Sequence, residues 1–155
     1  MLQPPVPQRV FVDADVLATR TPFCWLAMLR DETDGAFRLH TSDGTLTAAT
    51  EDWRSRHPDA GEVVAVRREQ LLRAVLDDVT DDGAPVGFTP PDEFLCLVDD
   101  AAGASVRALT LRRHAELERR RQTGIPSASL VDTLVAAGCP AFAARVAAHL
   151  RAARD

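Results

Sequence analysis

Two aspartates close an apolar run near the start of the chain, and their types and spacing suit metal chemistry. Residues 10–12 (Val-Phe-Val) are β-branched and aromatic, which predicts a strand buried on both faces. Asp13 and Asp15 follow at i and i+2, so an extended chain would project both carboxylates from one side. Two such carboxylates repel each other unless a proton or a cation lies between them. Mg²⁺ or Mn²⁺ with oxygen ligands would satisfy both. The alternative left open is that one aspartate caps the next helix and the other is solvated.

The elements that must position these aspartates alternate between strand and helix patterns. The sequence predicts strands over residues 10–12, 37–41 and 85–88, and helices over residues 22–33, over residues 42–56 and from residue 61. This order predicts an α/β fold with a small parallel sheet. The carboxyl ends of parallel strands meet at one edge, where ligand sites form. We therefore expect Asp13 and Asp15 at that edge.

A helix is expected to begin at Gly61. Apolar side chains at Val64, Leu71, Leu72, Val75 and Val79 give it one apolar face, the kind that packs against a core.

Residues 91–155 predict a helical C-terminal extension of an α/β domain formed by residues 1–90. Pro90 and Pro91, followed by Asp92 and Glu93, are typical of a helix start. Gly103 is expected to break this helix. Further helices are predicted over residues 105–122, over residues 125–137 and from Pro140, with a glycine at position 138 where a helix-ending residue belongs, and with Phe142, Val146 and Leu150 facing inward.

Composition indicates a globular, cytoplasmic protein. The 155 residues are 46% hydrophobic, and no apolar run is long enough for a membrane span. The first residues lack the pattern of a secretion signal. Three scattered cysteines are expected to be reduced thiols, and four histidines lack ligand spacing. Residues 1–104 carry a net charge of −10 and residues 105–155 a net charge of +5, so the tail could bind nucleic acid or simply pack against the body.

Several stretches together resemble the PIN-domain family of ribonuclease-like proteins, which includes the VapC toxins of bacterial toxin–antitoxin pairs. The first is Val-Phe-Val-Asp-Ala-Asp-Val-Leu at residues 10–17, followed by a helix and by Leu-His-Thr-Ser-Asp at residues 39–43. The likeness extends through residues 54–59 and resumes at residues 91–100 and 137–142. It implies a small parallel-sheet PIN-like domain with a helical C-terminal extension.

The resemblance also implies a metal-dependent ribonuclease site. In that family a carboxylate at the end of the first strand, a glutamate on the helix after the second, and further aspartates bind Mg²⁺ or Mn²⁺. The metal activates water for attack on an RNA phosphodiester. Carried over to this chain, the metal ligands would be Asp13, Asp15 and Glu51. The catalytic carboxylates would be Asp13, Glu51 and Asp92, with Ser42 as a supporting hydroxyl.

The acidic cluster departs from the family pattern in two ways. Ungapped counting places the family's glutamate near Ala48, whereas the glutamate on that helix is Glu51. The acid-bearing segment that the family has before its last strand is missing, because the acids at residues 77–78 and 81–82 are typical of a helix end and a turn. The sequence therefore predicts a shortened PIN-like domain with weak or absent ribonuclease activity.

Two alternatives remain. A PIN-like fold with an incomplete metal site would suit a non-catalytic module that binds a partner in a toxin–antitoxin system. Asp13 and Asp15 also resemble the first motif of haloacid-dehalogenase-type phosphatases, with Asp99 and Asp100 as a later motif if residues 94–98 formed a strand. That chemistry relies on a lysine, and the chain has none. The partners to expect are RNA, an antitoxin or other protein, and a second copy in a homodimer, with no membrane.

Overall fold

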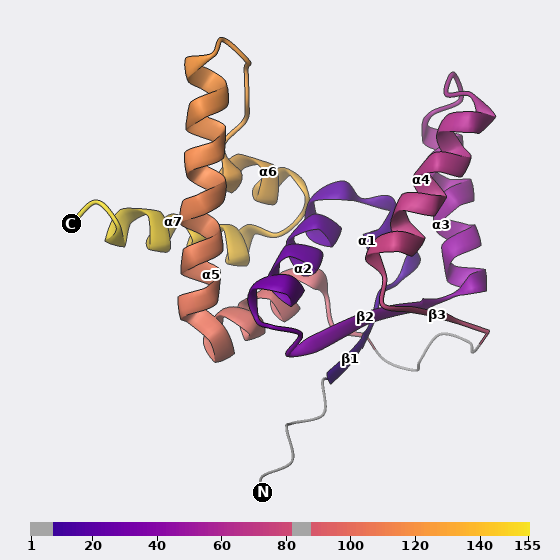
Figure 1. Cartoon of the computed structure of the whole chain (residues 1–155), viewed down its shortest axis with the longest axis horizontal. Helices are drawn as coiled ribbons and strands as arrows, with labels where there is room; N and C mark the ends of the chain where they lie inside the picture. Colours follow the sequence, from indigo (N-terminus) through magenta and orange to yellow (C-terminus); the bar gives the residue numbers. More distant parts are fainter. Residues whose placement is uncertain (1–7, 82–87) are drawn as a thin grey trace, which may run out of the picture.

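The chain folds as an α/β domain that continues into a long helical region, as predicted (Figure 1). This computed structural model describes residues 8–81 and 88–155. In chain order the elements are β1 (Gln8–Phe11), α1 (Ala14–Ala18), α2 (Arg20–Glu32), β2 (Phe37–Ser42), α3 (Asp43–Arg56), α4 (Glu62–Val75), β3 (Asp78–Thr80), α5 (Pro91–Gln122), α6 (Leu130–Ala136) and α7 (Pro140–Ala152).

The three strands form one parallel sheet in the order β1-β2-β3. In the register of the first pair, Val10 lies opposite Leu39. Along β2 the side chains alternate, since Phe37 and Leu39 are buried while Arg38 is exposed. β2 therefore lies where the sequence predicted a strand, whereas β1 overlaps the predicted residues 10–12 but begins at Gln8 and ends at Phe11. In Figure 1 the α3–α4 pair rises at one end of the sheet and α5 at the other.

The third strand corrects a prediction. We expected Val79 on the helix that begins near Gly61, but α4 ends at Val75 and Val79 lies in β3, opposite Thr41. The strand predicted over residues 85–88 falls largely outside the described residues, and Phe88 at its end is exposed without regular structure.

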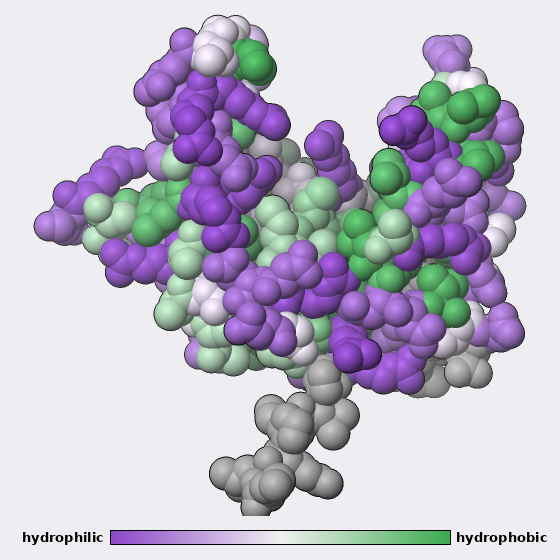
Figure 2. All heavy atoms as spheres, in the orientation of Figure 1, coloured by the Kyte–Doolittle hydropathy of each residue, from purple (hydrophilic) through white to green (hydrophobic). Residues whose placement is uncertain are grey.

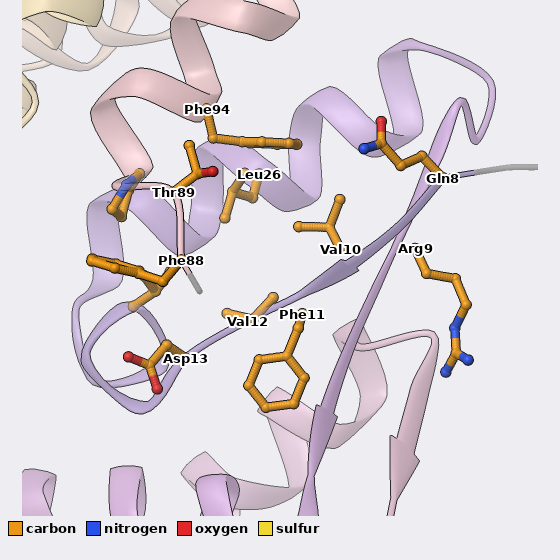
Figure 3. A pocket seen from close by; sticks show the side chains of 12 residues that line it. Gln8, Arg9, Val10, Phe11, Val12, Asp13, Leu26, Phe88, Thr89 and Phe94 are labelled. Atoms are coloured by element: carbon orange, nitrogen blue, oxygen red, sulfur yellow. The ribbon is translucent and has the colours of Figure 1, made fainter. Parts of the chain in front are cut away.

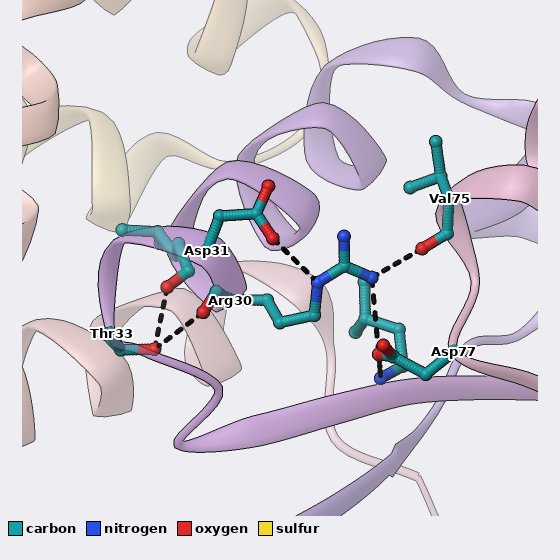
Figure 4. Close-up of polar contacts among 7 residues, drawn as sticks. Arg30, Asp31, Thr33, Val75 and Asp77 are labelled. Atoms are coloured by element: carbon teal, nitrogen blue, oxygen red, sulfur yellow. Dashed lines mark hydrogen bonds and ion pairs between the residues drawn. The ribbon is translucent and has the colours of Figure 1, made fainter.

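Asp77 is the physical reason for the early third strand (Figure 4). Its backbone N–H donates to the carbonyl of Leu39 at 2.8 Å, and its carboxylate accepts from the Leu39 N–H at 2.7 Å. Arg30 of α2 forms an ion pair with the same carboxylate at 3.2 Å and donates to the carbonyl of Val75. Residue 77, which the sequence suggested was a helix end, thus joins the end of α4 to β2.

Local signals set several helix ends. Ser42 caps α3 at the start of the helix predicted over residues 42–56, and Gly138 after α6 has the positive φ of 82° that favours glycine. Within α5 the backbone of Ala102 is non-helical, so the break expected at Gly103 occurs one residue earlier as a kink. Two starts differ from the predictions: α2 begins at Arg20 rather than at residue 22, and α6 begins at Leu130, where Ser129 provides the cap.

One core runs through both parts of the chain. Leu39 of the sheet, Leu29 of α2, Leu95 of α5 and Phe142 of α7 are all fully buried in it. The ring of Phe142 packs edge to face on the ring of Trp25, with 5.2 Å between the ring centroids. The extension therefore packs on α2 and does not stand apart from the sheet domain. None of the helices in the described part of the chain is both long and apolar enough to cross a membrane.

Candidate functional site

Asp13 stands at the carboxyl end of β1 and caps the short helix that follows. One of its carboxylate oxygens accepts from the N–H of Ala14 at 2.8 Å, and its side chain is exposed. Asp15 is also exposed but lies in the first turn of α1. The expectation that the two project from one side of a strand is wrong, because the chain turns helical at Ala14 and strand alternation ends there. Asp13 thus does what the cap alternative describes.

Ser42, which caps α3, and Glu51, which lies within that helix, differ in their exposure to solvent. Ser42 is buried at the head of the helix, where its hydroxyl accepts from the N–H of Thr45 at 3.1 Å and lies 2.8 Å from the Thr45 hydroxyl. Glu51 is exposed further along the helix, on the side away from the buried Leu46 and Ala49. Ser42 thus has a structural partner, and Glu51 faces solvent.

Asp92, one of the predicted catalytic carboxylates, caps a different helix. One of its oxygens accepts from the N–H of Ala141 at 3.1 Å, and the other accepts from the N–H of Phe142 at 2.7 Å. These amides belong to the first turn of α7, where backbone N–H groups have no partner within the helix. Both oxygens of Asp92 are therefore engaged in joining the start of α5 to the start of α7.

The predicted ligands are not gathered into one cluster in the part of the chain that the structure describes. Over residues 8–81 and 88–155, no three His, Cys, Asp or Glu side chains lie together in a way that could hold an ion. Mg²⁺ requires nearly octahedral oxygen coordination. Asp13, Asp15 and Glu51 are each exposed, and the described residues do not form the cluster that the chemistry needs.

A cavity of about 430 Å³ borders Asp13 between β1 and the start of α5 (Figure 3). Its walls are largely apolar, with Val10 and Val12 on one side and Phe88 and Phe94 on another. Asp13 is the one carboxylate among the described residues that line it. A single carboxylate supplies fewer oxygen ligands than a divalent ion requires.

Two arginines that the sequence did not single out hold α1 in position. Arg68 of α4 donates to the carbonyl of Leu17 at 2.8 Å, and Arg56 at the end of α3 donates to the carbonyl of Ala18 at 3.2 Å. The Arg68 guanidinium lies 5.4 Å from the centre of the Trp53 ring. Burial lowers the pKa of Arg68, and the neighbouring charge of Arg56 lowers it further. The two cations occupy the carboxyl-terminal end of α1, where the helix dipole favours positive charge.

Asp99 and Asp100 belong to a polar link between α5 and α7. Arg145 forms ion pairs with both, at 3.2 and 2.5 Å, and the His149 ring lies 2.7 Å from Asp99. Residues 94–98 are helical, so the strand required by the phosphatase alternative is absent from this part of α5. These acids therefore join two helices of the extension.

The exposed side of α4 is the feature that sequence reasoning misjudged most. Val64 and Leu71, expected on a face that packs against a core, are 52% and 58% exposed, and Val63 and Val66 are 82% and 42% exposed. Leu72 is buried as expected, and the other buried residue of the helix is Ala65, which the predicted face did not include. We call the exposed residues from Glu62 to Arg73 the α4 face; it includes a hollow of about 590 Å³ lined by Glu62, Val63, Val66, Arg67, Gln70 and Leu71.

The α4 face lies on a part of the molecule that stands clear of the body. Figure 2 shows hydrophobic side chains gathered on the α3–α4 projection. The signal that could have revealed it is the valine repeat at positions 63, 64 and 66, because such a run puts apolar residues on more than one side of a helix.

Comparison with known protein families, with curated proteins and with solved structures finds no match for this chain.

Proposed function

We propose that the chain is a PIN-like domain that works as a protein-binding module and has little or no ribonuclease activity. Three features support the PIN-like relation: the β-α-α-β-α-α-β order, the aspartate that closes β1, and the serine at the head of α3. Two features argue against catalysis: the predicted ligands do not converge among the described residues, and Asp92 has both oxygens bound to backbone amides.

The α4 face is the observation that carries the binding function. Four large aliphatic side chains on one short helix face solvent, and a soluble protein rarely leaves such a group uncovered without a partner. Because Ala65 and Leu72 already anchor α4 to the body, the exposed residues are not needed to hold the helix in place. Val63 and Leu71 are therefore free to contact another protein.

A toxin–antitoxin pair is the biological setting that the resemblance implies, and the neighbouring reading frame would then encode a binding partner. Residual metal-dependent RNA cleavage is the second candidate function. The observation that favours it is the place of Asp13, which is exposed at the carboxyl edge of the sheet beside a cavity. Asp13 would then be the essential residue.

The experiment that tests the binding function uses two matched double variants. The purified chain, alone and mixed with the product of the neighbouring reading frame, is analysed by size-exclusion chromatography with light scattering. Val63→Ser/Leu71→Ser should abolish a complex that the wild type forms. Ile125→Ser/Val135→Ser, which removes two apolar side chains that are each 53% exposed elsewhere, should leave it intact. A complex that survives in the α4 variant, or a wild type that forms none, would overturn the proposal.

A further inference from the structure

The cavity beside Asp13 lies along the free edge of the sheet. β1 is the outer strand in the order β1-β2-β3, and within the described residues no other strand pairs with its far side. The N–H of Val12 donates to the carbonyl of His40 at 2.8 Å, so the even-numbered residues of β1 direct their main-chain groups to β2. Neighbouring residues of a strand direct these groups to opposite sides. The carbonyl of Phe11, which lines the cavity, is therefore directed to the free edge.

Three oxygen acceptors border this cavity. Asp13 uses one carboxylate oxygen to cap α1, and its side chain is exposed. The hydroxyl of Thr89 belongs to the wall formed by the start of α5 (Figure 3), and the carbonyl of Phe11 belongs to the wall formed by β1. A primary ammonium group has three N–H donors and no acceptor. The cavity thus provides one charged and two neutral acceptors for such a group.

The walls of the cavity are otherwise largely apolar. They include the side chains of Val10, Val12, Leu26, Phe88 and Phe94. Phe94 packs edge to face on Phe37, with 5.7 Å between the ring centroids, so this wall is held in place by the core. Phe88 is 75% exposed, so its ring is available to contact an ammonium group bound at Asp13. The volume of about 430 Å³ is within the range of roughly 300–1,000 Å³ that small-molecule sites occupy.

The charges around the cavity favour a ligand with a single positive charge. Asp13 is the one carboxylate among the described residues that line it, so it balances one positive charge. Arg9 also lines the cavity, but its guanidinium forms an ion pair with Asp78 of β3 at 3.4 Å. Residues 1–104 carry a net charge of −10, which raises the local concentration of cations. The ligand that fits is therefore a monovalent cation with an apolar body.

We propose that this cavity binds a small organic amine. Its ammonium group contacts the Asp13 carboxylate, the Phe11 carbonyl and the Thr89 hydroxyl, and its apolar ring lies between β1 and Phe94. The site shares no residue with the α4 face, so it is a ligand site in addition to the proposed protein-binding function.

Naphthylmethylamine is the probe, because it joins one ammonium group to a flat apolar ring system. A ligand of this size with ordinary contacts has a dissociation constant on the order of 1 mM or tighter, so the measurement is an amide NMR titration to about 5 mM. The signals of Val10, Val12 and Ala14 should shift and saturate. Naphthalenemethanol, which lacks the charge, and butylamine, which lacks the ring, should each bind at least about tenfold more weakly.

Two matched variants test the role of Asp13. Asp13→Asn keeps the α1 cap, because Asn is as good an N-cap residue as Asp, but it removes the charge. It should raise the dissociation constant of naphthylmethylamine at least about tenfold. Asp15→Asn removes an exposed carboxylate that lies outside the cavity lining, and it should change this constant by less than about twofold. The melting temperature of each variant verifies that it is folded.

Three results would each overturn the inference: a wild type whose signals do not saturate, an alcohol that binds as tightly as the amine, and equal losses in the two variants. Each of these results would leave the protein-binding function as it stands, because that function is tested by complex formation through Val63 and Leu71.

Discussion

Replacing Asp92 separates a structural role from a catalytic one. Its two oxygens accept from the N–H groups of Ala141 and Phe142, so Asp92→Ala leaves two amides at the start of α7 without a partner. Loss of a helix cap costs about 0.5–2 kcal/mol. Hydrogen bonds to a charged group contribute about 1.5–3 kcal/mol each, although neighbouring bonds do not add in full. We expect the free energy of unfolding to fall by about 2 kcal/mol, toward the upper end of the range for caps.

The assay is urea denaturation followed by far-ultraviolet circular dichroism. In a chain of this size, a loss of about 2 kcal/mol corresponds to a melting temperature lower by about 4–8 °C. Asp92→Asn keeps one oxygen acceptor but loses the charge at the positive end of α7, so it should cost about 1 kcal/mol. Glu93→Ala changes the exposed neighbouring acid and should stay within about 0.5 kcal/mol of the wild type.

The opposite pattern would refute the structural role. If Asp92→Ala unfolded at the wild-type urea concentration and at the same time removed a stabilisation by Mn²⁺, Asp92 would be a metal ligand. Its contacts with α7 would then contribute little.

Three further predictions follow from particular side chains. Burial raises the pKa of the Cys139 thiol to about 11. At pH 8 iodoacetamide should therefore modify the exposed Cys24 in the native protein and should modify Cys139 only after unfolding. Rapid labelling of Cys139 in the native protein would contradict its burial. Burial lowers the pKa of His40 below its ordinary 6.5, so the histidine of the unfolded chain takes up a proton at a higher pH than that of the folded chain. Below about pH 6.5 the free energy of unfolding should therefore fall more for the wild type than for His40→Gln. Parallel curves of this free energy against pH would exclude the linkage. Asp77→Ala removes the acceptor for Leu39 and should lower the free energy of unfolding by about 1–3 kcal/mol, whereas an unchanged urea midpoint would show that β3 pairs without it.

The sequence predicted the elements whose signals are local. A β-branched run predicted β1, and Ser42 predicted the start of α3. Pro140, two positions after Gly138, predicted the start of α7. Each of these signals acts within a few residues, so no knowledge of the rest of the fold was needed.

What the sequence could not predict depends on contacts between distant segments. Asp92 meets the amides of α7 from about fifty positions away, and no local pattern distinguishes such a cap from a metal ligand. The predicted apolar face of α4 combined Leu72, which is buried, with Val64 and Leu71, which are exposed. Apolar residues lie on more than one side of this helix, so their spacing alone did not identify the buried side. Val79 fitted the helical period, but its neighbour Asp77 pairs with Leu39 and draws the segment into the sheet.

Cleavage of single-stranded RNA in Mn²⁺ tests the central claim most directly. Wild type and Asp13→Ala are compared at equal concentration, and the melting temperature of the variant is measured alongside to verify that loss of the α1 cap leaves it folded. Because the described carboxylates do not converge on one position, we predict that the wild type cleaves no faster than Asp13→Ala. Cleavage by the wild type that disappears in a folded Asp13→Ala variant would show that the chain is a working nuclease and would contradict the account.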